Sequence, residues 1–328
     1  MVPVHDILRM HIRLSEPYCE VQRLPWVFGK KNRFLGENKE GEVPYYVNYY
    51  AGCSHGCLYC YSLCFAQRMG RIRLPQGQRK VRYSDWIKPR LEQKWKRIEQ
   101  ELKSNKWRKE VFLQSTSDSY APFVRKKVTR KILEWLRVYE YPVLVLTKNP
   151  HVLRDKDFFK EYRANCRVGF TITVPEKYEA IRKKVEPRSP STRKRIAALE
   201  ELYSYGCQTT VSMEPLLPNI DVGDMLDLMD KLRPLIYGVC FVGMLTRSSI
   251  PPQFRKAKVW RDIGNEGAYE DYYEDLLRQL LPAIKKKYNV ATHTFKFCLN
   301  HKIRGVEANY SRLPKQYQKM IVENKQRT

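Results

Sequence analysis

Three cysteines that lie close together in the chain have the side chains and the spacing needed to bind a metal. Cys53, Cys57 and Cys60 follow a Cys-x3-Cys-x2-Cys pattern, which is short enough to place three thiolates on one loop. A closed structural metal site normally takes four protein ligands. Three protein ligands leave one coordination position open, where a substrate or a cofactor can bind. The pattern therefore predicts a metal centre with a free position.

A zinc site is the alternative interpretation of the same segment. Cys64 continues the series as Cys-x3-Cys-x2-Cys-x3-Cys, and His55 lies inside it, so either residue could be a fourth ligand. Zinc sites more often combine separate pairs of ligands, and one compact run of four cysteines is unusual. We expect Cys64 to be packed in the first turn of a helix and His55 to be a hydrogen-bonding residue of the loop.

Short apolar segments alternate with segments of helical periodicity. We expect helices over 123–138 and 191–205, and strands over 45–50, 111–114, 143–146, 168–173, 209–213 and 235–242. Several of these strands are almost continuously hydrophobic, as parallel strands buried on both faces are. The alternation predicts an α/β fold with a parallel sheet built from right-handed crossovers. A partial (β/α)6 barrel of the TIM type fits this order best.

The predicted barrel places the cysteines where enzymes of this architecture carry out their chemistry. The first expected strand ends at Tyr50, and the cysteine segment begins directly after it. In such barrels the active site lies at the carboxyl ends of the strands. We expect three regions: a basic N-terminal cap over 1–40, the barrel core over 41–247, and a helical C-terminal extension over 248–328 with a helix at 267–287.

The charge of the chain indicates a polyanionic partner. Its 61 Lys and Arg residues exceed its 35 Asp and Glu residues, which gives a net charge of +26. Such an excess favours nucleic acid as a partner, although a generally basic proteome or a salt-rich cytosol would also produce it. Basic clusters occur at 94–97, 106–109, 182–184 and 193–195. We expect the last two to lie near the cofactor end of the barrel.

The length and the apolar segments limit the class of protein further. A chain of 328 residues can bury the core of one large α/β domain. No apolar run approaches the roughly 20 residues of a membrane helix, and the first residues lack the apolar core of a signal peptide. We expect a cytoplasmic protein without membrane association, and clustered cysteines then indicate metal binding in place of disulfides.

Five segments in order resemble the radical S-adenosylmethionine enzymes of the spore photoproduct lyase-like family. The segment Asn48–Tyr61 resembles the cluster loop of that family. The other similar segments are Ser115-Thr116-Ser117-Asp118, Leu146-Thr147-Lys148, Glu186-Pro187-Arg188 with the helix that follows, and Met213–Pro218. The resemblance covers roughly residues 44–245.

The resemblance implies a cluster and a cofactor. Cys53, Cys57 and Cys60 would hold a [4Fe–4S] cluster, whose open iron would bind S-adenosylmethionine. Lys148 would pair with the methionine carboxylate of the cofactor. An external one-electron donor of the flavodoxin or ferredoxin type would reduce the cluster, and the cofactor would be cleaved to a 5′-deoxyadenosyl radical.

Four further residues would lie near the cofactor by the same resemblance. They are Ser117, Asp118, Thr171 and Glu186. Ser117 and Asp118 could instead cap a helix, because both residue types favour helix starts. Glu186 could equally be a surface residue in a basic segment.

One position departs from the family pattern. Spore photoproduct lyase has a hydrogen-donating cysteine where this chain has Ser115. A serine O–H bond is too strong to give hydrogen readily to a carbon radical, so we expect a different reaction. Tyr59 and Tyr61 match two tyrosines of the lyase's hydrogen-transfer chain and are the candidate catalytic residues.

The sequence therefore predicts a radical S-adenosylmethionine enzyme that acts on a nucleic acid, in repair or in base modification. Two alternatives remain. The same chemistry could act on a peptide or a small metabolite, with the charge incidental. The chain could also be a non-enzymatic nucleic-acid-binding module that holds zinc.

Overall fold

The computed structural model describes the central part of the chain. The described residues are 45–47, 49–51, 53–60, 88–89, 95–105, 108, 110–114, 117–122, 124–217, 220–236, 240–244 and 290–292. Several predictions concern residues outside these ranges. They are the N-terminal cap, Tyr61, Cys64, Ser115 and the helix at 267–287.

A seven-stranded parallel sheet forms the centre of the structure, and its strand order β1-β4-β5-β6-β7-β8-β9 follows the order along the chain. Each strand pairs in parallel with the next one. The strands are β1 Tyr45–Val47, β4 Val111–Leu113, β5 Val143–Thr147, β6 Cys166–Thr171, β7 Gln208–Leu216, β8 Cys240–Met244 and β9 Val290–Thr292. A parallel sheet whose strands follow one another in chain order is typical of a partial barrel. This arrangement confirms the predicted α/β class.

Two details of the sheet differ from the prediction. The first strand ends at Val47, and Tyr50–Ala51 forms the separate strand β2, which pairs in the antiparallel direction with β3, Lys88–Pro89. A continuous run of strand-forming residues does not reveal where the chain changes its pairing partner. The strand β9 lies within the extension that we predicted to be helical, and it adds a seventh strand to the six expected.

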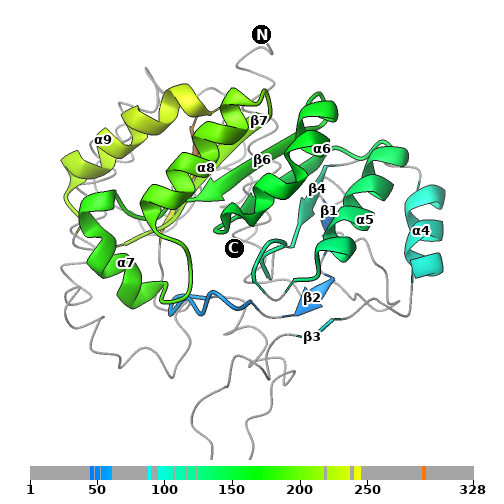
Figure 1. Ribbon diagram of the computed structural model, residues 1–328, viewed down its shortest axis with the longest axis horizontal. Coiled ribbons are helices and arrows are strands. Elements are labelled where there is room, and N and C mark those ends of the chain that lie inside the picture. Colours follow the sequence, from blue (N-terminus) through cyan, green and yellow to red (C-terminus); the bar gives the residue numbers. More distant parts are fainter. Residues whose placement is uncertain are drawn as a thin grey trace, which may run out of the picture.

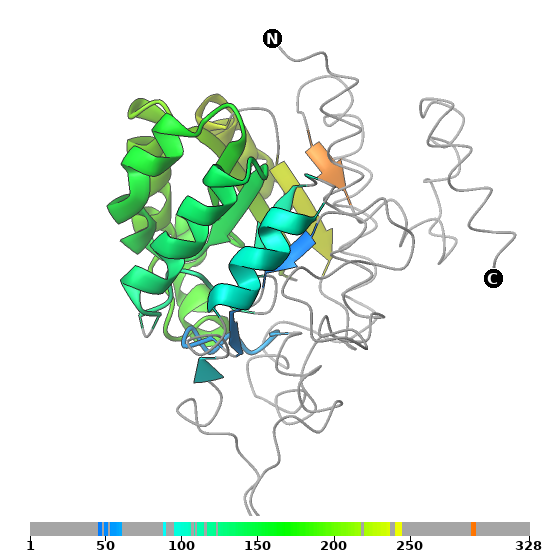
Figure 2. The ribbon, with the colours of Figure 1, turned by 90° about the vertical axis from the view of Figure 1, so that its right-hand side faces the viewer.

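The described helices lie on one side of the sheet (Figures 1 and 2). They are α4 Trp95–Ser104, α5 Lys126–Val138, α6 Lys156–Glu161, α7 Glu179–Val185, α8 Thr192–Ser204 and α9 Val222–Leu232, with short 3₁₀ turns η1 Pro150–Asp155, η2 Glu176–Tyr178 and η3 Arg233–Leu235. Side chains cap two of the helix starts. Ser191 accepts a hydrogen bond from the Lys194 amide (3.3 Å), and Asp221 accepts one from the Asp224 amide (3.1 Å).

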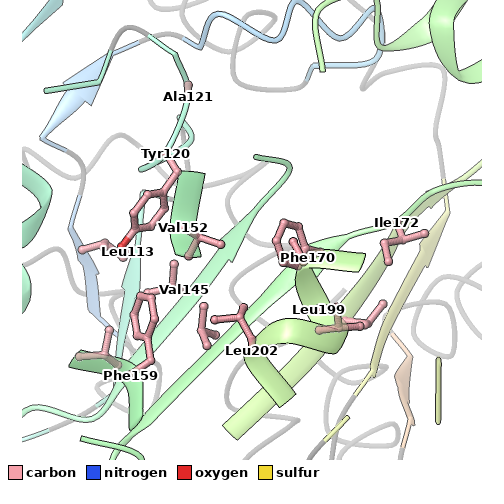
Figure 3. Close-up of a cluster of buried hydrophobic side chains, with 14 of the residues drawn as sticks. Leu113, Tyr120, Ala121, Val145, Val152, Phe159, Phe170, Ile172, Leu199 and Leu202 are labelled. Atoms are coloured by element: carbon pink, nitrogen blue, oxygen red, sulfur yellow. The ribbon is translucent and has the colours of Figure 1, made fainter. Parts of the chain in front are cut away.

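The main hydrophobic core fills the space between the helices and the sheet. Figure 3 shows Leu113, Val145 and Phe170 from three neighbouring strands together with Phe159 and Leu199 from the helices. Side chains alternate between the two faces of a strand. The opposite face of the sheet therefore receives the residues between these apolar positions, and on β6 and β7 these include the polar residues Thr171, Thr210 and Ser212.

Candidate active site

The segment 53–60, here called the cysteine loop, lies at the carboxyl end of the sheet beside α7 (Figure 1). Two backbone hydrogen bonds hold it against the chain around the end of that helix. The Leu58 amide donates to the carbonyl of Val185 (2.9 Å), and the Arg188 amide donates to the carbonyl of His55 (3.1 Å). Gly56 has a φ of +68°, a left-handed conformation that glycine adopts without strain. These bonds join the cysteine loop to the segment between β6 and α8, which contains α7.

The three thiols of the cysteine loop lie in one neighbourhood. Burial raises the pKa of Cys57 to about 12, although the charge of Lys148 acts in the opposite direction. Burial, Asp118 and the other two thiols raise the pKa of Cys53 well above its usual value. Among the described residues, no three Cys, His, Asp or Glu side chains form a group suited to a single metal ion. Thiols bind metal ions as thiolates, so metal binding at this loop would release protons.

Asp118 is the first of two buried carboxylates that hold the cysteine loop. Its Oδ1 accepts hydrogen bonds from the Tyr120 amide (2.8 Å) and the Thr147 hydroxyl (2.6 Å). Its Oδ2 accepts from His55 Nε2 (2.8 Å) and from the Lys148 amide (2.9 Å). A carboxylate has about four acceptor positions, and all are occupied here. Asp118 thus ties the cysteine loop to the carboxyl ends of β4 and β5.

The electrostatic surroundings keep Asp118 ionised. Burial alone would raise its pKa, but His55 and the hydrogen bonds from Lys148 and Thr147 outweigh burial and hold the pKa well below its usual range. His55 is a hydrogen-bonding residue of the loop, as expected from the sequence. Contact between Asp118 and the cofactor stays a prediction, and a carboxylate with every acceptor position in use is better suited to hold the loop.

Glu186 is the second buried carboxylate, and its side chain is fully buried. Its Oε1 accepts hydrogen bonds from the hydroxyls of Tyr59 and of Thr173 (3.0 Å). Its Oε2 accepts from the Ser189 hydroxyl (3.0 Å) and pairs with the guanidinium of Arg195. Glu186 is therefore not the surface residue that the basic segment around it suggested. Its contact with the cofactor stays a prediction. Here too each acceptor position of the carboxylate has a hydrogen-bond donor within the protein.

Charges of opposite sign stabilise this second network. Burial would raise the pKa of Glu186, but the positive charges of Arg195 and Lys148 hold it well below its usual range. Arg195 is fully buried in α8. Its other donors reach the carbonyls of Thr171 (2.8 Å) and Pro190 (3.0 Å). A buried ion pair of this kind is favourable only when the remaining polar atoms of both partners are hydrogen-bonded, as they are here.

Tyr59 takes part in this network through its hydroxyl. Burial and the neighbouring carboxylate of Glu186 raise its pKa well above the usual value, so the phenol keeps its proton. Its role in hydrogen transfer stays a prediction, and Tyr61 lies outside the described residues. The observed function of the hydroxyl is to join the cysteine loop to the pair of Glu186 and Arg195.

The cation predicted to bind the cofactor lies beside the cysteine loop. The Lys148 Nζ is 5.9 Å from the centroid of the Tyr59 ring, and the side chain is partly exposed. Within the described part of the chain its ammonium group makes no ion pair, so it is available to an incoming carboxylate. Thr171 lies at the end of β6 and is nearly buried, and Ser117 is partly exposed.

The sequence contained no sign of Thr173 as part of the site, and it suggested Arg195 only as a member of a basic cluster near the cofactor end, whereas its side chain is fully buried. A signal for Arg195 was present, because the buried face of α8 includes Thr192, Ile196, Leu199 and Leu202. Arg195 falls on that same face by helical spacing. A charged residue within an apolar helical face indicates a buried partner, but its position alone does not identify Glu186 as that partner.

Comparison with known proteins identifies the family. The model of the radical SAM superfamily matches residues 47–232, which include the cysteine loop and both carboxylates. The chain belongs to the radical SAM superfamily. Members of this superfamily are enzymes that use a [4Fe–4S] cluster and S-adenosylmethionine. The three thiols, which can each bind a different iron, fit such a cluster. The alternative of a non-enzymatic zinc module is therefore set aside.

Two curated relatives align with most of the length of this radical SAM chain. The uncharacterized protein MJ0683 of Methanocaldococcus jannaschii is 27% identical over 265 residues, which cover 79% of this chain and 92% of that protein. The uncharacterized protein ORF301 of Acidianus two-tailed virus is 25% identical over 256 residues, covering 75% of this chain and 82% of the viral protein.

Solved structures confirm the predicted partial barrel. A variant of spore photoproduct lyase with a dinucleoside spore photoproduct has a TM-score of 0.53 at 14% identity, covering 78% of each chain. A second variant, with bound AdoMet and the same photoproduct, has a TM-score of 0.52 at 14% identity, covering 76% of this chain and 75% of that one. At this identity the likeness shows the fold alone.

No helix in the described residues has the length and apolar character needed to cross a membrane.

Proposed function

We propose that this radical SAM enzyme acts on a nucleic acid, in repair or in base modification. The net charge of +26 is the observation that carries this proposal, because phosphate neutralisation by Lys and Arg supplies most of the affinity of proteins for nucleic acids. A peptide or metabolite substrate would not require such an excess.

Exposed basic residues near the cysteine loop support the proposal. Lys183 and Lys184 are exposed at the end of α7, next to Val185, whose carbonyl binds the loop. Arg188, which binds the loop through its amide, and Arg193 at the start of α8 are also exposed. A phosphate backbone that contacts these side chains would lie close to the cofactor end of the barrel.

In the proposed cofactor site, the residues at this end of the sheet would have different roles. Cys53, Cys57 and Cys60 would hold the cluster, which when bound supplies the electron that cleaves S-adenosylmethionine. Lys148 would pair with the carboxylate of the cofactor, and Ser117 and Thr171 would line its site.

Asp118 and Glu186 would act on this chemistry indirectly. Each would keep one side of the cysteine loop in place, Asp118 through His55 and Glu186 through Tyr59. A loop fixed before the metal arrives presents its thiols in the required geometry without a further loss of conformational freedom. We assign both carboxylates as positioning residues.

The reaction would differ from that of spore photoproduct lyase, because Ser115 replaces the hydrogen-donating cysteine of the lyase. Tyr59 and Tyr61 remain the candidate hydrogen donors. The enzyme would work in the cytoplasm with an external electron donor of the flavodoxin or ferredoxin type.

Anaerobic turnover with total RNA and total DNA of the host tests the proposal. The reduced, iron-loaded protein is expected to form 5′-deoxyadenosine and nucleosides of altered mass in one of the two pools. The variant Cys57→Ala, which lacks one thiolate, is the control and should form neither. Formation of 5′-deoxyadenosine with peptides or metabolites, but without any altered nucleoside, would contradict the nucleic-acid proposal.

A further inference from the structure

Gln114 has an unusual backbone conformation at the carboxyl end of β4. It directly follows Leu113, and its amide donates a hydrogen bond to the carbonyl of Val47 in β1 (2.9 Å). Its φ is +61°, in the left-handed region that residues with a Cβ rarely adopt. Conformations of this kind persist where the surrounding structure enforces them, and they are common at ligand-binding sites.

The side chain of Gln114 is also unusual. It is 2% exposed, and within the described part of the chain neither its amide oxygen nor its amide nitrogen has a hydrogen-bond partner. Burial of a carboxamide without partners is unfavourable, and most buried polar side chains in proteins are paired. The positive φ of the backbone does not explain why the side-chain amide has no partner among the described residues.

Gln114 belongs to the same end of the sheet as the cysteine loop. Its carbonyl accepts a hydrogen bond from the Ser117 amide (3.4 Å), and the turn between them leads to Asp118. Asp118 binds both His55 of the cysteine loop and the amide of Lys148. Gln114 therefore lies one short turn along the chain from the groups that surround the proposed cofactor site.

We propose that Gln114 binds the edge of a nucleobase. A carboxamide offers a carbonyl acceptor beside an NH₂ donor, and this pair matches a ring edge that presents a donor and an acceptor side by side. The inference rests on the proposed function, since a base of the nucleic-acid substrate has such an edge. The adenine of S-adenosylmethionine has the same chemistry, and the experiment distinguishes the two sources.

The variant Gln114→Met separates this role from a structural one. Methionine has a similar shape without the polar atoms, so it removes an unpartnered buried amide. The melting temperature of the protein without cofactor is expected to rise by a few degrees. The matched control is Thr209→Val, which removes a buried hydroxyl that donates to the Leu235 carbonyl (2.6 Å). That control should lower the melting temperature.

Ligand binding is then measured with defined probes on the iron-loaded protein. The probes are S-adenosylmethionine, by calorimetry, and single-stranded homopolymers of dA, dC, dG and dT, by fluorescence anisotropy at fixed salt. For a substrate base, the wild type should prefer one homopolymer, and Gln114→Met should lose that preference by about tenfold or more, with an unchanged salt dependence. For the cofactor, the affinity for S-adenosylmethionine should fall by a similar factor.

Two results would overturn the inference. One is a Gln114→Met variant whose affinities for all these probes equal those of the wild type. The other is a melting temperature that falls as it does for Thr209→Val. Failure of the proposed function has a different signature, because the wild type would then bind no homopolymer in a salt-dependent manner while the cofactor measurement would still test Gln114.

Discussion

The hydroxyl of Tyr59 donates a hydrogen bond to Glu186, a carboxylate that is fully buried and paired with Arg195 of α8. Through this bond the cysteine loop is attached to the helix layer. On the other side of the loop, His55 binds Asp118, which also accepts a hydrogen bond from the hydroxyl of Thr147 at the end of β5. The loop is therefore held from two sides by carboxylates whose acceptor positions are occupied by donors of the protein.

The attachment through Tyr59 is tested by Tyr59→Phe with Thr173→Val as its control. Both variants remove one hydroxyl donor from the same oxygen of Glu186, but only the first releases the cysteine loop. We expect Tyr59→Phe to increase hydrogen exchange over 53–60 and to lower the iron retained after reconstitution several-fold. Thr173→Val should cost about 1 kcal/mol of stability and keep the iron. Equal effects on the loop would refute the attachment.

The attachment through Asp118 is tested by Asp118→Asn. The amide nitrogen of Asn would face donors, so at least one of the bonds from His55, Thr147 and the Lys148 amide is lost. We expect a loss of about 1–3 kcal/mol of stability for each donor left without a partner, together with reduced iron loading. The control Thr147→Val also weakens this network but keeps the bond to His55, and it should load iron as the wild type does. Iron content and urea unfolding measure the two effects.

The buried ion pair of Glu186 and Arg195 should show strong coupling. Arg195→Met leaves the Glu186 carboxylate buried without its cation, and a loss of about 3–5 kcal/mol is typical of such a change. The double variant Glu186→Gln with Arg195→Met removes both charges and should lose less stability than Arg195→Met alone. Urea unfolding of the metal-free protein under reducing conditions measures the losses of these two variants and of Glu186→Gln alone. Additive losses would show that the two side chains are not energetically coupled.

Acid should destabilise the metal-free protein through the same carboxylate. The pKa of Glu186 lies below its ordinary value of 4.5, because Arg195 and Lys148 outweigh the effect of burial. The unfolded chain therefore binds this proton at higher pH than the folded protein does. The resulting stability is present above about pH 4.5 and is lost as the pH falls through the lower, folded pKa. The urea midpoint of unfolding is measured between pH 7 and pH 3. With decreasing pH it should fall less steeply for the double variant Glu186→Gln with Arg195→Met than for the wild type.

The nucleic-acid surface is tested by removing two charges at a time. Lys183→Gln with Lys184→Gln removes exposed cations beside the cysteine loop. Lys160→Gln with Arg163→Gln removes two exposed cations at the opposite end of the sheet, one in the last turn of α6 and one between α6 and β6. We expect the first pair to weaken binding of a single-stranded oligonucleotide and to reduce the slope of log K against log salt by up to about 1.4. The second pair should leave the slope unchanged. Equal losses from both pairs would indicate unspecific attraction by the net charge.

The sequence by itself was sufficient for the parts of this protein that depend on local pattern. Apolar runs predicted β4 to β7 to within a few residues, because strands buried on both faces read as continuous hydrophobic segments. The spacing of Cys53, Cys57 and Cys60 predicted that their thiols lie near one another, since residues on one short loop are close in space whatever the rest of the chain does. Their role as metal ligands stays a prediction. Local pattern did not show the end of β1 at Val47 or the strand β9, because both depend on pairing with distant segments.

Only the tertiary structure showed which groups Asp118 and Glu186 contact. The sequence left two roles open for each: a cofactor contact or a helix cap for Asp118, and a cofactor contact or a surface position for Glu186. Their hydrogen-bond partners come from positions up to 127 residues away along the chain. Whether a carboxylate has a free acceptor depends on how many donors the fold brings to it, and no short-range pattern records that number. For the same reason the sequence does not single out Gln114, whose buried amide has no hydrogen-bond partner within the described part of the chain.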